Sequence, residues 1–208
     1  MDSARVTSKG EAKKQYILDK ALDVIAKEGI KGTTHRLVAK EADVPPSLTT
    51  YYFVSIDDLI LQAINRFVER VRPEQIQIAH SLINQIHQDQ ENDLSPREIA
   101  LGISHRIFTY MVKQLKERPT GLAVEVALLY QSHLNQDLAL KAGDYRRALI
   151  SDAEQVMQAL KAKTPALDAR LMMGTVLRLE YESLNTDQGP SEQSLKEQLD
   201  RLILALIA

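Results

Sequence analysis

The chain has no cysteine, which excludes disulfide bonds and catalysis by a thiolate. It also has no apolar run approaching the roughly eighteen residues that a membrane-spanning helix needs. Its first 15 residues are polar and have no apolar centre, unlike a secretory signal. From these absences we expect a cytoplasmic protein without a membrane-spanning segment.

The sequence also lacks the common motifs of enzymes. It contains no glycine-rich phosphate loop, no HExxH zinc motif and no nucleophile elbow. His80 and His87 are seven residues apart on one predicted helix face, about 10.5 Å along the axis, which is too far to bind one metal ion. We therefore predict no enzymatic activity, no metal site and no cofactor.

Helical periodicity, by contrast, runs along the whole chain. Between residues 13 and 27 apolar residues recur with the spacing of one helix face, and Gly29 follows as a stop signal. The alternation of apolar and polar residues that marks a half-buried strand is absent. We predict an all-α protein with about ten helices. They span residues 13–27, 34–42, 46–53, 55–72, 74–89, 96–117, 119–133, 136–163, 165–185 and 191–207.

The most informative segment is residues 33–59, TTHRLVAKEADVPPSLTTYYFVSIDDL. Thr34 is a natural N-cap for one short helix, and Pro46 suits the first turn of the next. A third helix begins at Ser55, because Ser55 and Asp58 can each accept a hydrogen bond from a free backbone N–H. Two short helices joined by a tight turn place side chains in the major groove of DNA in helix-turn-helix proteins. The segment predicts a DNA-binding transcriptional regulator.

These three helices need a shared core, and the remaining residues face outward. Hydroxyl groups on the outer face can bond phosphates or base edges, and the start of the first short helix can bind a phosphate. The predicted core contains Ile17, Leu22, Ile25, Val38, Ala39, Val44, Leu48 and Phe53. The predicted DNA contacts are Thr34, His35, Arg36, Pro46, Ser47, Thr50, Tyr51 and Tyr52, with Thr49 as a further candidate.

Charge is unevenly distributed, although the net charge is only −2. Residues 1–53 carry nine Lys/Arg and seven Asp/Glu, a net charge of +2, whereas the remaining 17 basic and 21 acidic residues give −4. Two interpretations of the N-terminal cations stay open: they reach DNA phosphates, where counterion release favours each contact, or they only keep a leader segment solvated. These cations are Arg5, Lys9, Lys13, Lys14, Lys20 and Lys27.

The strings THRLVAKEA, VPPSLTTYYF and SIDDL resemble the TetR (tetracycline-repressor-like) family, and the resemblance covers residues 13–60. It implies a cytoplasmic homodimer that binds a palindromic operator and, in most members, represses transcription until a small ligand binds the C-terminal domain. The eight DNA contacts predicted above occupy the family's operator-contacting positions. Two departures are Ile56, where the family often has a phosphate-binding lysine, and Pro45-Pro46, which stiffens the turn and removes two backbone donors.

The resemblance divides the chain into a helix-turn-helix DNA-binding domain, residues 1–54, and a larger helical ligand-binding and dimerisation domain, residues 55–208. Apolar stripes on helices 165–185 and 191–207 can pack against their symmetry mates in a two-fold homodimer. The alternative is that one of these helices lies wholly in the core of its own protomer. The predicted dimer residues are Leu171, Thr175, Leu179, Leu199, Leu202 and Leu206.

Polar groups within apolar stretches, with adaptable methionines beside them, are the candidates for a pocket that binds a small-molecule effector. The same residues could instead fill the core or form an internal ion pair, such as Glu125 with Arg106 or Arg178. The candidates are Phe67, Arg106, Tyr110, Met111, Glu125, Tyr130, His133, Met172 and Arg178.

The expected mechanism is a population shift. The two reading helices of a dimer must lie about 34–36 Å apart to enter successive major grooves. An effector releases the operator only if it binds a state with another spacing better. Two alternatives are an activator of the same architecture and a helical adaptor whose helix-turn-helix binds protein. Steep salt dependence of binding distinguishes DNA from protein as the partner.

Overall fold

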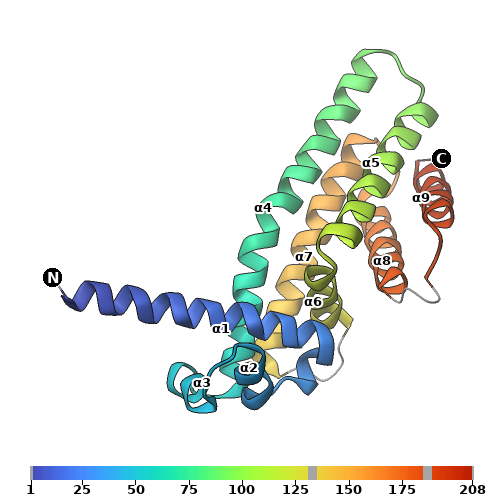
Figure 1. Ribbon diagram of the computed structural model, residues 1–208. Helices are drawn as coiled ribbons and strands as arrows, with labels where there is room; N and C mark the ends of the chain where they lie inside the picture. Colours follow the sequence, from blue (N-terminus) through green and yellow to red (C-terminus); the bar gives the residue numbers. More distant parts are fainter. Residues whose placement is uncertain (1, 131–134, 185–188, 208) are drawn as a thin grey trace. The chain divides into compact units, whose positions relative to one another are not determined.

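The computed structural model describes residues 2–130, 135–184 and 189–207, with side chains from residue 9 onward. This part of the chain forms nine α-helices and no strand (Figure 1), which confirms the all-α class. None of these helices is both long and apolar enough to cross a membrane. They are α1 (Asp2–Gly32), α2 (His35–Glu41), α3 (Pro46–Tyr52), α4 (Ile56–Glu91), α5 (Pro96–Glu117), α6 (Pro119–Tyr130), α7 (Gln136–Ala159), α8 (Pro165–Ser183) and α9 (Glu192–Leu206).

α1 begins earlier than predicted, at Asp2, and kinks where the stop was predicted. Gly29 has φ 71 and ψ 172, outside the helical region, and glycine adopts this conformation readily because it has no Cβ. Thr33 Oγ1 donates a hydrogen bond to the Gly29 carbonyl oxygen at 2.8 Å. This bond gives the Gly29 carbonyl a side-chain partner near the end of α1, where backbone carbonyls lack helical partners.

α4 corrects one prediction. Two helices separated at Pro73 were expected, but α4 is continuous through this residue. A proline inside a helix removes one backbone hydrogen bond and costs about 3 kcal/mol. The residues on either side of Pro73 make long-range contacts: Arg72 Nη1 donates to Asp152 Oδ2 on α7 at 2.7 Å, and Glu74 pairs with Arg118. Tertiary packing therefore overrides a local breaker.

The chain divides into two compact units. The first comprises residues 1–70 and 123–142, and the second comprises residues 71–122 and 143–208. The predicted DNA-binding domain, residues 1–54, lies inside the first unit, and the assignment of roles to residues 1–54 and 55–208 stays a prediction. Of the core predicted for this region, Val44 and Leu48 are half-buried. The fully buried members are Ile17, Leu22, Ile25, Val38, Ala39 and Phe53.

The second unit is built on α9 packed against α5 and, less extensively, against α8. Leu195, Leu199 and Ile203 form the buried face of α9. Ser104 on α5 is completely buried, and its hydroxyl donates to Asp200 Oδ1 on α9 at 2.6 Å. α9 is thus held in its own protomer by apolar burial and by a polar bond.

Candidate nucleic-acid interface

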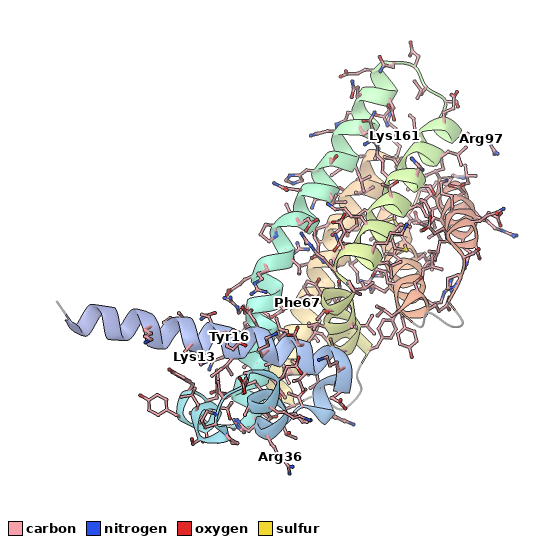
Figure 2. All side chains as sticks on the ribbon, viewed as in Figure 1. Lys13, Tyr16, Arg36, Phe67, Arg97 and Lys161 are labelled. Carbon is pink, nitrogen blue, oxygen red and sulfur yellow. The ribbon has the colours of Figure 1, made fainter. Side chains whose placement is uncertain are left out.

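α2 begins at the predicted side-chain cap. Thr34 is extended, and its Oγ1 accepts a hydrogen bond from the Leu37 backbone N–H at 3.2 Å. Thr34 and Arg36 are exposed, and Figure 2 shows Arg36 pointing outward from α2. His35 is half-buried, and its Nδ1 is buried without a hydrogen-bond partner among the described residues. The first turn of α2 therefore presents Thr34 and Arg36 more fully than His35.

A tight turn joins α2 to α3. Asp43 in this turn has φ 50, a left-handed conformation that aspartate tolerates better than most residues. The Asp43 N–H donates to the Lys40 carbonyl oxygen at 3.2 Å, and the Val44 N–H donates to that of Ala39 at 3.0 Å. These bonds close the end of α2 and set the direction in which α3 starts.

α3 has a polar outer face. Pro46, Ser47 and Thr50 are exposed, and Tyr51 is 78% exposed. Thr50 Oγ1 donates to the Ser47 carbonyl oxygen at 3.1 Å, which leaves the hydroxyl lone pairs able to accept. The further candidate Thr49 is wrong: it is completely buried, and its hydroxyl donates to the Pro46 carbonyl oxygen at 2.8 Å.

Tyr52 differs from its exposed neighbour because it is half-buried. Its ring lies edge-on to that of Tyr51, with centroids 5.1 Å apart, and 6.4 Å from that of Phe53. Its hydroxyl oxygen is 3.7 Å from the position that a Cβ on Gly10 would take. Tyr52 therefore extends toward α1, and only part of it remains accessible to DNA.

Val54 is a surface residue that was not among the predicted contacts. It follows α3, and its side chain is 98% exposed. The cap that follows is confirmed, since Asp58 N–H donates to Ser55 Oγ at 3.1 Å and Asp58 Oδ2 accepts from Val54 N–H at 3.0 Å. No signal in the sequence marks Val54 as exposed, because an apolar residue before a capping serine often packs against the following helix.

Ionic contacts around Asp19 join α1 to α4 within the first unit. Arg66 donates through Nε to Oδ1 at 2.8 Å and through Nη2 to Oδ2 at 3.1 Å, and Arg70 also pairs with Oδ1. Burial acts to raise the pKa of Asp19, but the hydrogen bonds from Arg66 and the charge of Arg70 outweigh it and hold the pKa below its ordinary value. The ionised carboxylate thus fastens α1 to the start of α4.

Residues 17–63 match the family of bacterial regulatory proteins called the tetR family. The match contains all of α2 and α3. The N-terminal region of this chain is therefore similar to that of TetR-family regulators. A curated relative, an uncharacterized HTH-type transcriptional regulator of Xanthobacter autotrophicus, is 42% identical over 62 residues. This alignment covers 30% of the chain and 31% of the relative, about a third of its length.

Solved structures resemble the chain over more than nine-tenths of its length. A TetR-family regulator from Agrobacterium tumefaciens has a TM-score of 0.73 at 15% identity, covering 96% of this chain and 100% of its own. A structure from Saccharomonospora viridis in complex with choline has a TM-score of 0.72 at 16% identity, covering 93% and 96%. A transcriptional regulator from Rhodococcus sp. Rha1 has a TM-score of 0.67 at 17% identity, covering 93% of this chain and 95% of its own. At such identities the similarity shows the shared fold.

The predicted pocket residues fall in both units. In the first unit lie Phe67, Glu125 and Tyr130, and in the second lie Arg106, Tyr110, Met111, Met172 and Arg178. Met111 and Met172 are buried, whereas Tyr110 is half-buried. His133 lies outside the described residues. The predicted pocket residues are therefore divided between the two units.

Two predicted pocket residues, Arg106 and Arg178, lie at the surface of the second unit. Arg106 Nη2 donates to Gln85 Oε1 at 2.6 Å. Arg178 donates through Nη1 to Glu182 at 2.7 Å and through Nη2 to Gln198 Oε1 at 2.8 Å. Both guanidinium groups are thus engaged by neighbouring polar side chains.

The predicted dimer residues require a correction. Leu179 and Leu199 are completely buried within the protomer, so the prediction that they contact a partner subunit is wrong. A side chain with no exposed area has nothing left to bury against a second chain. Leu171, by contrast, is 50% exposed. The half-buried members of the set are Thr175, Leu202 and Leu206.

α8 carries an exposed stripe of which the predicted dimer residues form only a part. Its members recur at spacings of four and three residues, which places them on one helix face. Leu167 and Tyr181 are each 55% exposed. Gly174 faces open space, since a Cβ added there would have no heavy atom of another residue within 4 Å apart from its own stretch of helix. The stripe consists of Leu167, Leu171, Gly174, Arg178 and Tyr181.

Proposed function

We propose that this TetR-family regulator binds a palindromic DNA operator through α2 and α3 and represses transcription in the cytoplasm. The observation that carries the proposal is the outer face of α3, where Ser47, Thr50 and Tyr51 are exposed together. Hydroxyl groups and a phenol ring on one short helix suit contacts to base edges and phosphates. The family match over residues 17–63 supports the same assignment. An activator would use the same interface.

Selection from random double-stranded DNA tests the proposal. The expected result is a palindrome whose half-sites are separated by about one helical turn, roughly 10 base pairs. Binding to that palindrome should weaken steeply as salt concentration rises, because bound phosphates release counterions. No enriched sequence together with salt-independent binding to another protein would contradict DNA binding and favour the adaptor.

We also propose a homodimer formed through the exposed stripe of α8. The stripe combines apolar side chains with Gly174, where a second helix can approach closely. A two-fold axis through it would bring each Leu171 against the same surface of the partner, as an isologous interface requires. The half-buried Leu202 and Leu206 would extend this surface. The α3 helices of both protomers would then bind one operator.

We propose that a small effector binds the helical bundle of the second unit. The similarly folded Saccharomonospora viridis structure contains choline, and this supports a ligand-binding role for the fold. In this chain the buried Met111 and Met172, with the half-buried Tyr110, offer adaptable apolar surface. The effector would favour a state whose reading helices no longer fit the operator spacing of about 34–36 Å.

Release of a fluorescent operator duplex tests the effector proposal. Choline is the first probe, followed by a panel of apolar and cationic small molecules. A compound that raises the melting temperature and releases DNA supports the proposal, and Met172→Ala should weaken its effect. If the same concentration of the compound releases DNA from the wild type and from Met172→Ala, the assignment of Met172 to the effector site is wrong.

A further inference from the structure

The segment around α3 contains no positive charge. From Glu41 to Asn65 there is no lysine or arginine, and the segment carries four carboxylates, of Glu41, Asp43, Asp57 and Asp58. A protein gains most of its sequence-independent affinity for DNA by neutralising phosphates with cations. α3 can therefore read base pairs, but the cations that hold the duplex must come from other elements.

The N-terminal half of α1 is fastened beside α3. Lys14 Nζ lies 5.5 Å from the centroid of the Phe53 ring, at the C-terminal end of α3. The Tyr52 hydroxyl approaches Gly10, one turn earlier on α1. Figure 1 shows α1 running past α3 toward the N-terminus within the first unit. Tyr52 and Phe53, at the end of α3, thus lie against two successive turns of α1.

The lysines on this half of α1 differ from two lysines further along the helix, Lys20 and Lys27. Lys20 pairs with Asp23 at 2.9 Å, and Lys27 pairs with Glu41 at 2.9 Å. Among the described residues, no carboxylate pairs with Lys9, Lys13 or Lys14.

The carboxylate nearest in sequence to these three lysines, that of Glu11, accepts a hydrogen bond from Gln15 Nε2 at 2.7 Å. Lys13 Nζ lies 5.1 Å from the centroid of the Tyr16 ring, and Figure 2 shows the two residues on the same stretch of α1. Aromatic rings at Lys13 and Lys14 limit the positions of the ammonium groups without neutralising them. Lys9, Lys13 and Lys14 are therefore available to an anion.

We propose that α1 is a second DNA-contacting element, in which Lys9, Lys13 and Lys14 bind phosphates flanking the groove that α3 enters. The inference rests on the proposed function, and it assigns affinity to α1 and base recognition to α3. Phosphate contacts fix a protein on the duplex but carry no sequence information. The lysines should therefore affect binding strength and its salt dependence without affecting the preferred sequence.

The test measures the slope of log affinity against log salt concentration for the palindrome selected by the wild-type protein. Lys14→Gln should reduce the magnitude of the slope by about 2, and the triple Lys9, Lys13, Lys14→Gln variant by about 5, because each phosphate contact contributes about 0.9 and the proposed homodimer carries each lysine twice. Lys14→Arg keeps the charge and should retain the wild-type slope. Lys113→Gln is the matched control, since Lys113 is an exposed lysine of the second unit.

Selection with the triple variant completes the test. An unchanged palindrome with a reduced slope, at an unchanged melting temperature, supports the inference. A wild-type slope in the triple variant overturns it while the proposed function stands, and so does a changed palindrome. If the wild-type protein selects no sequence, the proposed function fails and this inference falls with it.

Discussion

Arg66 on α4 donates two hydrogen bonds to Asp19 on α1, at 2.8 Å and 3.1 Å, across 47 positions of the sequence. The pair is bidentate, a geometry in which arginine and carboxylate bind most strongly. It joins the helix that carries the proposed phosphate contacts to the helix that follows α3. Movement of the first part of α4 would therefore be transmitted to α1.

Asp19→Asn should lower the free energy of unfolding at neutral pH, because it removes the carboxylate that pairs with Arg66 and Arg70. The loss should be only about 1 kcal/mol, because solvent screens the charges of a partly exposed pair. Folding lowers the pKa of Asp19 below its ordinary value of 3.8, so its contribution is present above that pH and is lost as pH falls through the folded value. Urea unfolding at about pH 7 and about pH 3 measures the difference, which should shrink in acid. The control Asp23→Asn removes only a pair within α1. An equal deficit at both pH values would contradict this role.

Thr50→Ala and Tyr51→Ala should each weaken operator binding by about tenfold, since a good base contact contributes roughly 1–3 kcal/mol. Both side chains are exposed, so the melting temperature should stay within about 2 °C of wild type. Fluorescence anisotropy and thermal unfolding measure the two effects. Thr49→Val provides the contrast: this residue is completely buried, and its loss should affect stability first. Unaltered affinity in both exposed variants would refute the contact assignment.

Leu171→Glu should convert the proposed homodimer to monomers with little loss of protomer stability, because this side chain is already half exposed in the protomer. A charge in an apolar two-fold interface meets its own copy and must be desolvated, at several kcal/mol. Sedimentation equilibrium measures the mass. Leu140→Glu is the control, since Leu140 is 58% exposed on α7 and outside the α8 stripe. A mass of two chains for Leu171→Glu would show that dimerisation uses another surface.

Asp43→Gly should raise the free energy of unfolding by about 0.5 kcal/mol, since glycine adopts a positive φ without the cost that aspartate incurs. It should also strengthen DNA binding at low salt, because it removes a carboxylate from the turn before α3. Asp93→Gly is a close control: Asp93 has φ 56, against 50 for Asp43, but follows α4 in the second unit. The same gain in DNA affinity from both variants would rule out a local charge effect at Asp43.

Local signals in the sequence predicted most helix boundaries of the described chain. The cap at Ser95, where Ser95 and Glu98 satisfy each other's backbone N–H groups, set the start of α5. Such signals predict helix boundaries well because the residues that begin or end a helix interact within a single turn of the backbone. The outer face of α3 was predictable for the same reason, since the burial of Phe53 fixes which neighbours remain outside.

The sequence by itself thus determined the all-α class, the helix-turn-helix and the residues that α3 can present. Only the tertiary structure decided that α4 continues through Pro73, that Leu179 and Leu199 are core, and that Tyr52 extends toward Gly10. The physical reason is that burial and long-range pairing depend on which helices meet. An apolar stripe looks the same in a sequence whether it packs within one protomer or against another.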